Sequence, residues 1–380
     1  MRMRKLRELQ QKLRPKIIDK IFLGLFFLLL FIPMTKISHE NVSKRENRVL
    51  AKFPVLFVEN HFNEKFTSEF ESWFNDRFNG RRKLIHYHTK LKEPLDNFSQ
   101  NEWVYYGNEG WLFYKGNNSL DNFQNKTVFS EEELKIVSQY LSDIDNWARQ
   151  NGKLFYFLIA PDKNKIYGEH ITSLRKIRPN KESRANQFIK YLKENTSVKV
   201  VYPYQSLLNN KAKGLLYYKQ DTHWNDFGSY IAYSELLNVI KKDHKNIKNI
   251  YPSKYKKVLH ETGDLSKMIN FAISKDQSKY LEPEMTNESL CKYQTEDEDP
   301  RKGFECKNKS KPLKVVVFRD SFTTALTRYL NNTFSFVKYE WRWGITKTDL
   351  EYIKNNADII ILETVERYIP SLLSLKFPED

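Results

Sequence analysis

Several patterns that would indicate a function directly are missing from this 380-residue sequence. It contains no zinc-finger spacing, no aromatic RNA-binding motif and no long basic helix, so its net charge of +16 is weak evidence for nucleic-acid binding. Residues 1–35 contribute +6 of that charge, and the remaining basic residues are spread among many acidic ones. A modest positive surface suits an anionic glycan or an anionic membrane equally well. There is also no glycine-rich nucleotide loop and no internal repeat, and we expect no cofactor.

Cysteine is scarce as well, with only Cys291 and Cys306 in the chain. The two residues bracket a polar, charged segment, and no histidine lies near them, which argues against a metal site there. In an oxidising compartment they would close a surface loop as a disulfide. The alternative is a pair of unlinked thiols.

The N-terminus combines basic residues with an uninterrupted apolar run, Ile21–Met34. Fourteen residues is short for a membrane span, although Ile17, Ile18 and Ile37 extend the apolar character. The preceding basic residues favour a cytoplasmic N-terminus, and no small-x-small cleavage site follows the run. We therefore expect residues 1–37 to form a cytoplasmic tail and an uncleaved signal-anchor transmembrane helix. A cleaved signal peptide and a buried core helix are the alternatives.

Residues 38–100 are expected to form a polar linker and an N-terminal helical extension. Aromatic residues recur at helical spacing over Phe66–Ile85, which is typical of a core-facing stripe. Trp103–Tyr114 consists of two aromatic runs around Gly-Asn-Glu-Gly, which predicts a β-hairpin.

Helix and strand patterns alternate over Glu131–Tyr368. This alternation predicts an α/β domain with a mainly parallel sheet over residues 101–380, with a polar, irregular insertion around 263–312. Helices are expected at 131–150, 182–194, 226–241, 322–330 and 348–355, and strands at 153–160, 198–202, 314–318, 334–339 and 357–363.

Two segments of this domain carry residues suited to nucleophilic catalysis. Open α/β sheets place functional residues at the carboxyl ends of strands, and both Asp221-Thr222-His223 and Asp320-Ser321-Phe322 precede predicted helices. A serine nucleophile needs a base within reach, and the base needs an orienting carboxylate. We therefore predict Ser321 as the nucleophile, His223 as the base and Asp221 as the orienting residue.

Each of these residues also has a simpler role open to it. Ser321 or Asp320 would cap the following helix, Asp221 would stabilise a turn, and His223 would be a structural histidine. The two motifs taken together favour the catalytic interpretation.

These motifs resemble the AlgX/AlgJ group of SGNH-hydrolase-like proteins, also called DHHW proteins, which serve in O-acetylation of alginate and other polysaccharides. The resemblance spans nearly all of residues 40–370. The matching segments are Asn47-Arg48, Trp73-Phe74-Asn75-Asp76-Arg77-Phe78, Gly110-Trp111-Leu112-Phe113-Tyr114, Pro161-Asp162-Lys163, Tyr218-Lys219, Asp221-Thr222-His223-Trp224-Asn225, Gly263-Asp264-Leu265, Arg319-Asp320-Ser321-Phe322 and Glu366-Arg367-Tyr368.

The resemblance implies an SGNH-hydrolase-like fold with flavodoxin-like α/β/α layers and a circularly permuted motif order, because the Asp-x-His block precedes the Asp-Ser block. Two positions depart from the usual motifs: Thr222 stands where some members carry a second histidine, and Arg319 replaces a glycine. Trp224, Arg319 and Arg367 are candidate substrate contacts, with packing or ion pairing as the alternative for each. No metal site is expected.

By the same resemblance, we expect an O-acetyltransferase that modifies a cell-surface or exported polysaccharide through an acetyl-serine intermediate. A multi-span membrane-bound O-acyltransferase would supply the acetyl group, because acetyl-CoA is absent outside the cytoplasm. The expected location is the bacterial inner membrane, with the catalytic domain in the periplasm. The alternatives are a polysaccharide O-acetyl esterase and a non-catalytic polysaccharide-binding or assembly protein of the same fold.

Overall fold

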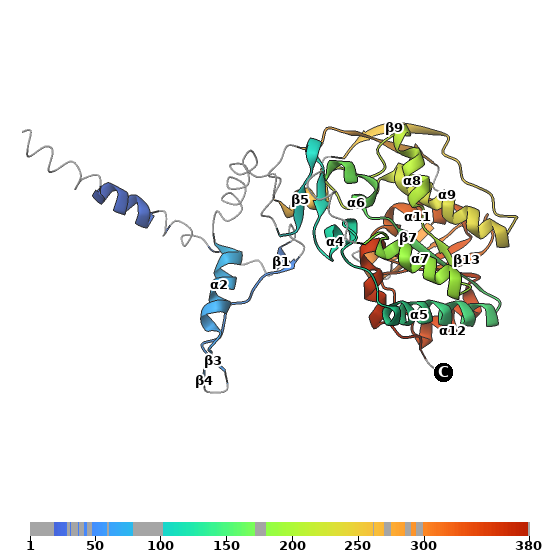
Figure 1. Ribbon diagram of the computed structural model, residues 1–380, viewed down its shortest axis with the longest axis horizontal. Coiled ribbons are helices and arrows are strands. Elements are labelled where there is room, and N and C mark those ends of the chain that lie inside the picture. The colour runs from blue at the N-terminus through green and yellow to red at the C-terminus, as the bar shows by residue number, and fades with distance from the viewer. Residues whose placement is uncertain are drawn as a thin grey trace, which may run out of the picture. The chain divides into compact units, whose positions relative to one another are not determined.

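The computed structural model divides the chain into two compact units (Figure 1). The first comprises Met1–Asn97 with Lys267–Ile273, and the second comprises Phe98–Ser266 with Ser274–Asp380. The structure describes residues 19–28, 31, 37, 42–43, 48–58, 61–78, 102–171, 180–260, 262–269, 275–285, 290–293 and 299–378.

The first unit contains short strand pairs and one well-described helix, α2 (Phe66–Arg77). The antiparallel pairs are β1 (Val42–Ser43) with β2 (Arg48–Val49), and β3 (Phe57–Val58) with β4 (His61–Phe62). The rings of Phe66, Phe70 and Phe74 stack along α2 at centroid distances of 6.1 and 6.3 Å. The predicted aromatic spacing is therefore helical over 66–77, and residues 79–85 of that prediction lie outside the described residues.

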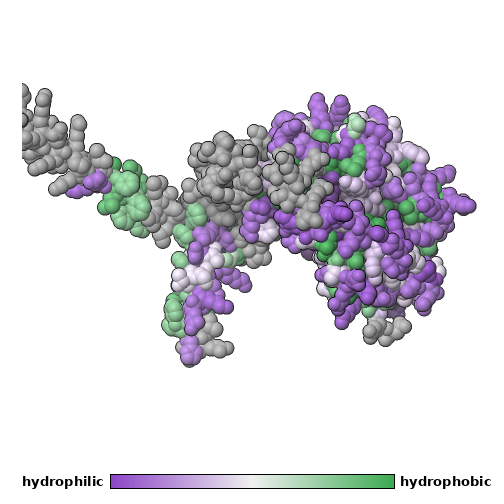
Figure 2. Space-filling model, in the orientation of Figure 1, coloured by the Kyte–Doolittle hydropathy of each residue, from purple (hydrophilic) through white to green (hydrophobic). Residues whose placement is uncertain are grey.

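The predicted N-terminal transmembrane helix is described only in part. Residues 19–28 are helical with exposed apolar side chains, and this segment is mostly hydrophobic in Figure 2. Within the described ranges, no helix is both long and apolar enough to cross a membrane. The remainder of the prediction, residues 1–18, 29, 30 and 32–36, lies outside those ranges.

A seven-stranded sheet organises the second unit, in the spatial order β11-β12-β14-β13-β15-β7-β8. The five strands from β14 to β8 are mutually parallel. At one edge of the sheet β12 pairs antiparallel with β14, and β11 pairs antiparallel with β12. The strands are β7 (Leu154–Ala160), β8 (Lys199–Val201), β11 (Leu290–Tyr293), β12 (Phe304–Lys307), β13 (Lys314–Phe318), β14 (Phe336–Glu340) and β15 (Ile359–Val365). The predicted α/β fold with a mainly parallel sheet is confirmed.

The order of the parallel strands has a simple relation to the flavodoxin-like order. Counted along the chain from β7, the spatial order β14-β13-β15-β7-β8 is irregular. If the five strands are numbered from β13 instead, and β7 and β8 are placed after β15, their spatial order becomes 2-1-3-4-5, which is the flavodoxin-like order. Such sheets bind ligands at the carboxyl ends of the two adjacent strands between which the strand order reverses, and here those strands are β13 and β15.

Helices cover both faces of this sheet (Figure 1). Because successive strand residues face opposite sides, Val315 and Val317 pack on one helical layer while Val316 and Phe318 pack on the other. The first layer includes α8 (Tyr204–Asn210), α9 (Asp226–Asp243) and α11 (Thr323–Thr333); the second includes α5 (Glu131–Gln150), α7 (Arg184–Asn195), α12 (Lys347–Asn356) and η6 (Glu366–Ser374). Ser130 begins α5 with a capping box, in which its hydroxyl accepts the N–H of Glu133 and the Glu133 carboxylate accepts the N–H of Ser130.

The segment predicted as an irregular insertion, 263–312, is more regular than expected. It contains β10 (Lys279–Glu284), which pairs with β9 (Lys254–Leu259), and it supplies the sheet strands β11 and β12. Cys291 and Cys306 face each other across β11 and β12 and are joined by a disulfide. Each of these two strands has only four residues, and charged residues interrupt their apolar pattern, so neither stands out as a strand in the sequence.

Short elements complete the second unit. The predicted hairpin forms from β5 (Val104–Tyr106) and β6 (Leu112–Tyr114) around the turn η2 (Asn108–Gly110), in which Glu109 and Gly110 have positive φ. The remaining elements are α4 (Ser119–Phe123), α6 (Lys163–Ile166), η3 (Gly168–His170), η4 (Lys211–Lys213), α10 (Asp264–Met268) and η5 (Pro300–Lys302).

Candidate active site

Ser321 lies in the tight connection between β13 and α11. The Asp320 carboxylate holds this connection, because its two oxygens accept the backbone N–H groups of Phe322 and Val365, each at 2.8 Å. Val365 is the last residue of β15, so the two hydrogen bonds of Asp320 connect the ends of β13 and β15, the strands between which the strand order reverses. The connection therefore presents the serine at a fixed place on the carboxyl end of the sheet.

His223 lies in a second loop, which is closed by a bridge between Tyr217 and Trp224. The loop leads directly into α9, whose N-cap Asn225 accepts the N–H of Gly228 at 2.9 Å. The sequence-based expectation placed this motif at the end of a strand, like the serine motif. That expectation is wrong, because α8 and η4 separate the loop from β8, the preceding sheet strand.

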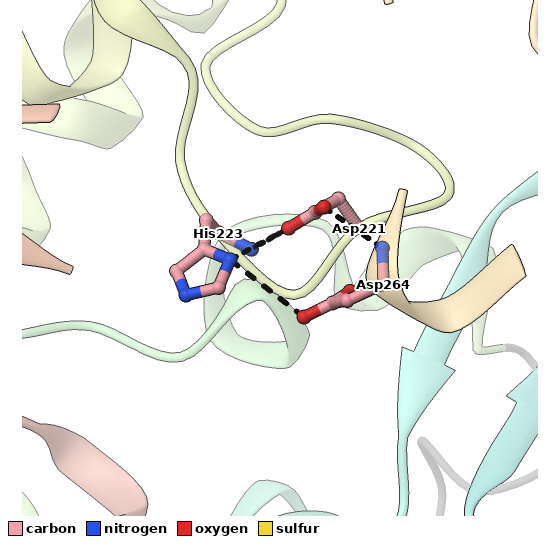
Figure 3. Close-up of side chains that lie close together, drawn as sticks. All are labelled: Asp221, His223 and Asp264. Atoms are coloured by element: carbon pink, nitrogen blue, oxygen red, sulfur yellow. Dashed lines mark hydrogen bonds and ion pairs between the residues drawn. The ribbon is translucent and has the colours of Figure 1, made fainter. Parts of the chain in front are cut away.

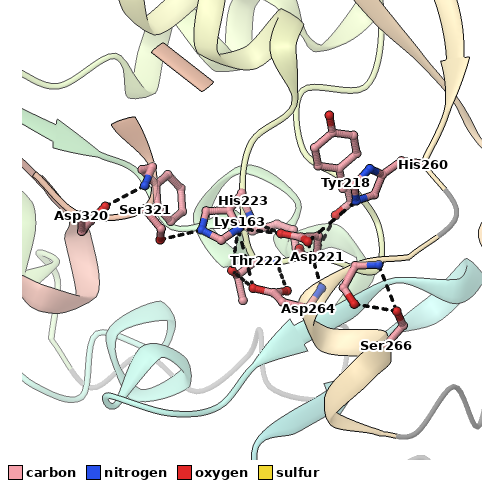
Figure 4. A network of polar contacts seen from close by, with 12 residues as sticks. Lys163, Tyr218, Asp221, Thr222, His223, His260, Asp264, Ser266, Asp320 and Ser321 are labelled. Carbon is pink, nitrogen blue, oxygen red and sulfur yellow. Dashed lines mark hydrogen bonds and ion pairs between the residues drawn. The ribbon is translucent and has the colours of Figure 1, made fainter. Parts of the chain in front are cut away.

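The three predicted catalytic side chains meet although 98 residues separate the histidine from the serine (Figure 4). His223 Nε2 lies 2.6 Å from Ser321 Oγ, and His223 Nδ1 lies 2.7 Å from Asp221 Oδ1. When Nδ1–H donates to the carboxylate, Nε2 is left to accept the serine proton. This is the relative geometry that a serine nucleophile, its base and an orienting carboxylate require.

The electrostatics of the two loop residues fit these roles. Burial alone would lower the pKa of His223, but the Asp221 charge and hydrogen bond outweigh it and raise that pKa above its ordinary value. Burial would raise the pKa of Asp221, but the His223 charge and its hydrogen bonds hold that pKa well below the usual range. The carboxylate thus stays ionised, and the imidazole becomes a better proton acceptor.

Asp264 is a further acid of this site to which sequence analysis gave no role (Figure 3). Its Oδ1 accepts the N–H of Thr222 at 2.7 Å, and its own N–H donates to Asp221 Oδ2 at 2.9 Å. Burial and the Asp221 charge raise the pKa of Asp264. Gly263 makes this approach possible, since a Cβ there would lie 1.9 Å from the Gln220 carbonyl oxygen.

Asp221, His223 and Asp264 also have the composition of a metal site, because one ligand atom of each lies within 4.8 Å of the others. Those atoms are engaged in the hydrogen bonds just described, with His223 Nδ1 and Asp221 Oδ1 bonded directly to each other. His223 Nε2 in turn contacts the serine. The arrangement therefore suits proton transfer to and from Ser321.

Lys163 stabilises the loop that carries His223 through hydrogen bonds to the backbone of that loop. It is 3% exposed, and its ammonium group donates to the carbonyl oxygens of Tyr218, Lys219 and Asp221 at 3.2, 3.0 and 2.6 Å. Burial lowers the pKa of Lys163 to about 7, against the opposing charges of Asp264 and Asp221. One side chain from the start of α6 thus fixes the backbone that carries Asp221.

Replacing Lys163 with methionine is expected to destabilise the protein and slow any reaction at Ser321. The loss removes the donor from the carbonyls of Tyr218 and Asp221, whereas the Lys219 carbonyl still accepts the N–H of Leu112. Each buried acceptor left unpaired costs about 1–3 kcal/mol. Thermal unfolding and ester hydrolysis measure the two effects. The exposed Lys190→Met on α7 is the control; equal behaviour of the two variants would contradict the supporting role.

Comparison with known proteins identifies the family of this chain. Residues 104–337 match the family model of the SGNH hydrolase-like domain of the acetyltransferase AlgX, over more than half of the chain. The chain belongs to this AlgX family. The resemblance stated from the motifs is thereby confirmed.

Solved structures similar to this AlgX-family chain have low sequence identity to it. Bacillus cereus PatB1 is 17% identical, with 72% of this chain and 99% of that chain covered at a TM-score of 0.52. A DHHW family protein from Eubacterium siraeum is 13% identical, and the match covers 75% of this chain and 99% of that chain at a TM-score of 0.53. The O-acetyltransferase domain of Pseudomonas putida AlgJ is 19% identical, and the match covers 73% of this chain and 94% of that chain at a TM-score of 0.46. No functionally curated protein matches the sequence.

Two of the three candidate substrate contacts in this AlgX-family chain are buried and make packing or hydrogen-bonding contacts, in line with the alternative given for them. Trp224 and Arg319 are each 1% exposed. The Trp224 indole donates to the carbonyl of Phe322 at 3.0 Å, and the Arg319 guanidinium lies 4.5 Å from the Trp341 ring centre while donating to the Asp320 carbonyl. Both side chains therefore brace the serine connection, and a substrate contact by either of them stays a prediction.

Arg367 is placed differently. Its guanidinium is paired with Asp162 at 2.5 Å and lies 5.4 Å from the centre of the ring of Phe322, the residue that follows Ser321. It also lines a pocket of about 230 Å³ together with Arg184 and Glu133. A substrate contact by Arg367 is compatible with this position and stays a prediction.

Proposed function

We propose that this AlgX-family protein is an O-acetyltransferase that acts through an acetyl-Ser321 intermediate on a cell-surface or exported polysaccharide. The observation that carries the proposal is the continuous set of hydrogen bonds from Asp221 through His223 to Ser321. Its support from similarity is the match to the acetyltransferase AlgX over residues 104–337.

The proposed reaction has two halves. Ser321 Oγ attacks the acetyl carbonyl while His223 Nε2 takes the hydroxyl proton, and the donor leaves with that proton. A glycan hydroxyl then attacks the acetyl-serine, His223 accepts its proton, and Ser321 recovers a proton as the acetyl group departs. Asp221 stabilises the imidazolium in both halves, and the Ser321 N–H is a candidate donor to the developing oxyanion.

The setting of this reaction is part of the proposal and rests on the sequence. The basic tail and the apolar run up to Met34 would hold the protein at the bacterial inner membrane, with the second unit in the periplasm. A multi-span membrane-bound O-acyltransferase would deliver the acetyl group across the membrane. The Cys291–Cys306 disulfide fits an oxidising compartment.

The experiment that tests the transferase assignment follows the fate of the acetyl group. The full chain is incubated with p-nitrophenyl acetate and candidate surface glycans, and acetylated glycan and free acetate are both quantified. A transferase gives acetylated glycan and faster phenolate release as the glycan concentration rises. Acetate alone would indicate the esterase, and no phenolate release above background would favour the binding or assembly role.

A further inference from the structure

Directly behind the serine connection, the sheet contains a buried acid that takes no part in the proposed triad. Glu363 lies in β15 and is 0% exposed. Its neighbours on the same face of the strand, Ile361 and Val365, belong to the apolar core beneath α9 and α11. An acid in such a position is costly unless it is paired or neutral.

Glu363 contacts both sides of Ser321. Its Oε2 accepts the backbone N–H of Asp320 at 3.2 Å and the hydroxyl of Thr323 at 2.7 Å. Asp320 in turn holds the N–H of Phe322. The residues immediately before and after the nucleophile are thus anchored, directly or through Asp320, to one carboxyl group.

The second oxygen of Glu363 indicates its protonation state. Over the described part of the chain, Oε1 meets no donor, and neither Glu363 nor Asp320 forms an ion pair. Glu363 and Asp320 are neighbouring acids, since Glu363 Oε2 accepts the Asp320 N–H, and two negative charges so close together repel each other. Two carboxylates only accept hydrogen bonds, so a hydrogen bond between the two side chains requires a proton on one of them. A proton on Glu363 also satisfies its orphaned oxygen.

The surroundings assign that proton to Glu363. Both oxygens of Asp320 accept backbone N–H groups, and the Arg367 charge on η6 acts favourably with Asp320, so Asp320 is the better place for the negative charge. Arg319 stacks on Trp341. Burial, and then the Asp320 charge, raise the pKa of Glu363 well above its ordinary value.

We propose that Glu363 is a positioning residue, which stays neutral, donates its proton to Asp320 and holds Ser321 in line with His223. The inference deepens the proposed function, on which its catalytic part rests. Glutamine keeps the size, the acceptor oxygen and a donor, so Glu363→Gln replaces the neutral acid closely. Leucine keeps the bulk but has no hydrogen-bonding group.

The activity test compares the full-length protein with its Glu363→Gln and Glu363→Leu variants on p-nitrophenyl acetate. Glu363→Gln is expected to keep a rate close to that of the parent and to lose any alkaline decline that parent activity shows, since an amide cannot ionise. Glu363→Leu is expected to lower kcat about 10²-fold at an unchanged KM. Asp145→Asn, a buried acid on α5 far from these contacts, is the control for acid-to-amide replacement. Parent-like turnover by Glu363→Leu, or a folded but inactive Glu363→Gln, would overturn the proposal.

A stability test needs no turnover and separates this proposal from the proposed function. The raised pKa of Glu363 contributes stability that is fully present below the unfolded pKa of about 4.3 and is lost as pH rises toward the folded pKa. The Tm of Glu363→Gln minus the Tm of the parent should therefore increase from pH 5 to pH 9. A difference that stays flat would overturn the neutral-acid assignment even if the parent proves inactive or Glu363→Leu does not fold.

Discussion

Replacing Ser321 with alanine is expected to reduce hydrolysis of p-nitrophenyl acetate to background and to abolish any acetyl adduct. The hydroxyl that lies 2.6 Å from His223 Nε2 is the only atom in the described site placed to attack a carbonyl with that base beside it. Loss of a serine nucleophile in such a triad typically costs about 10⁴- to 10⁶-fold in kcat. Phenolate release measured by absorbance gives the effect directly.

The matched control for this variant is Ser310→Ala. Ser310 is an exposed serine whose hydroxyl bonds only to Asn308 within the described residues, so its loss should leave the rate unchanged. A Ser321→Ala protein that is folded and still hydrolyses the ester like the parent would rule out Ser321 as the nucleophile.

Replacing Asp221 with asparagine is expected to lower kcat by about 10⁴-fold and to move the pH profile. The carboxylate fixes the His223 tautomer through a 2.7 Å bond, and its charge raises the pKa of His223. Parent activity should rise with pH as the imidazole loses its proton, with a midpoint above the ordinary imidazole value. In Asp221→Asn the residual activity should have a lower midpoint, because the charge that raised the pKa is gone.

Asp264→Asn is the informative comparison for that experiment. Asp264 also lies near the imidazole, with Oδ2 3.7 Å from Nδ1 in an ion pair. Its hydrogen bonds, however, are to Thr222 and Asp221. Its replacement should have a smaller effect on kcat than Asp221→Asn. The assignment of the orienting carboxylate to Asp221 would be refuted by the reverse order of effects.

Local pattern was enough to predict the five parallel strands, the main helices around them and the three residues that meet in the site. The apolar strand and its short exit motif predict where Ser321 lies, and the Asp-x-His spacing pairs base and carboxylate on one loop. The position of that loop could not be predicted in the same way. It is closed by its own bridge and lies next to the serine through the packing of α9 on α11, which no local pattern encodes.

The residues that sequence analysis missed act through contacts between distant segments. Asp264 reaches Thr222 from 42 positions away, and the steric need for Gly263 appears only where its backbone meets Gln220. Lys163 and Glu363 each have a sequence signal, a charged residue at the carboxyl end of an apolar strand. Without the fold, however, nothing distinguishes such residues from exposed turn positions. The burial of Trp224 and Arg319 could not be predicted either, because it is a property of the packed structure.

The most direct test of the central claim is intact-mass analysis of the full-length protein after brief exposure to p-nitrophenyl acetate, followed by peptide mapping. We predict a single acetyl increment, located on the peptide that contains Ser321, which disappears when an acceptor is added and is absent from Ser321→Ala. An acetyl group on another residue, or steady ester turnover by a protein in which Ser321 is never acylated, would contradict the account.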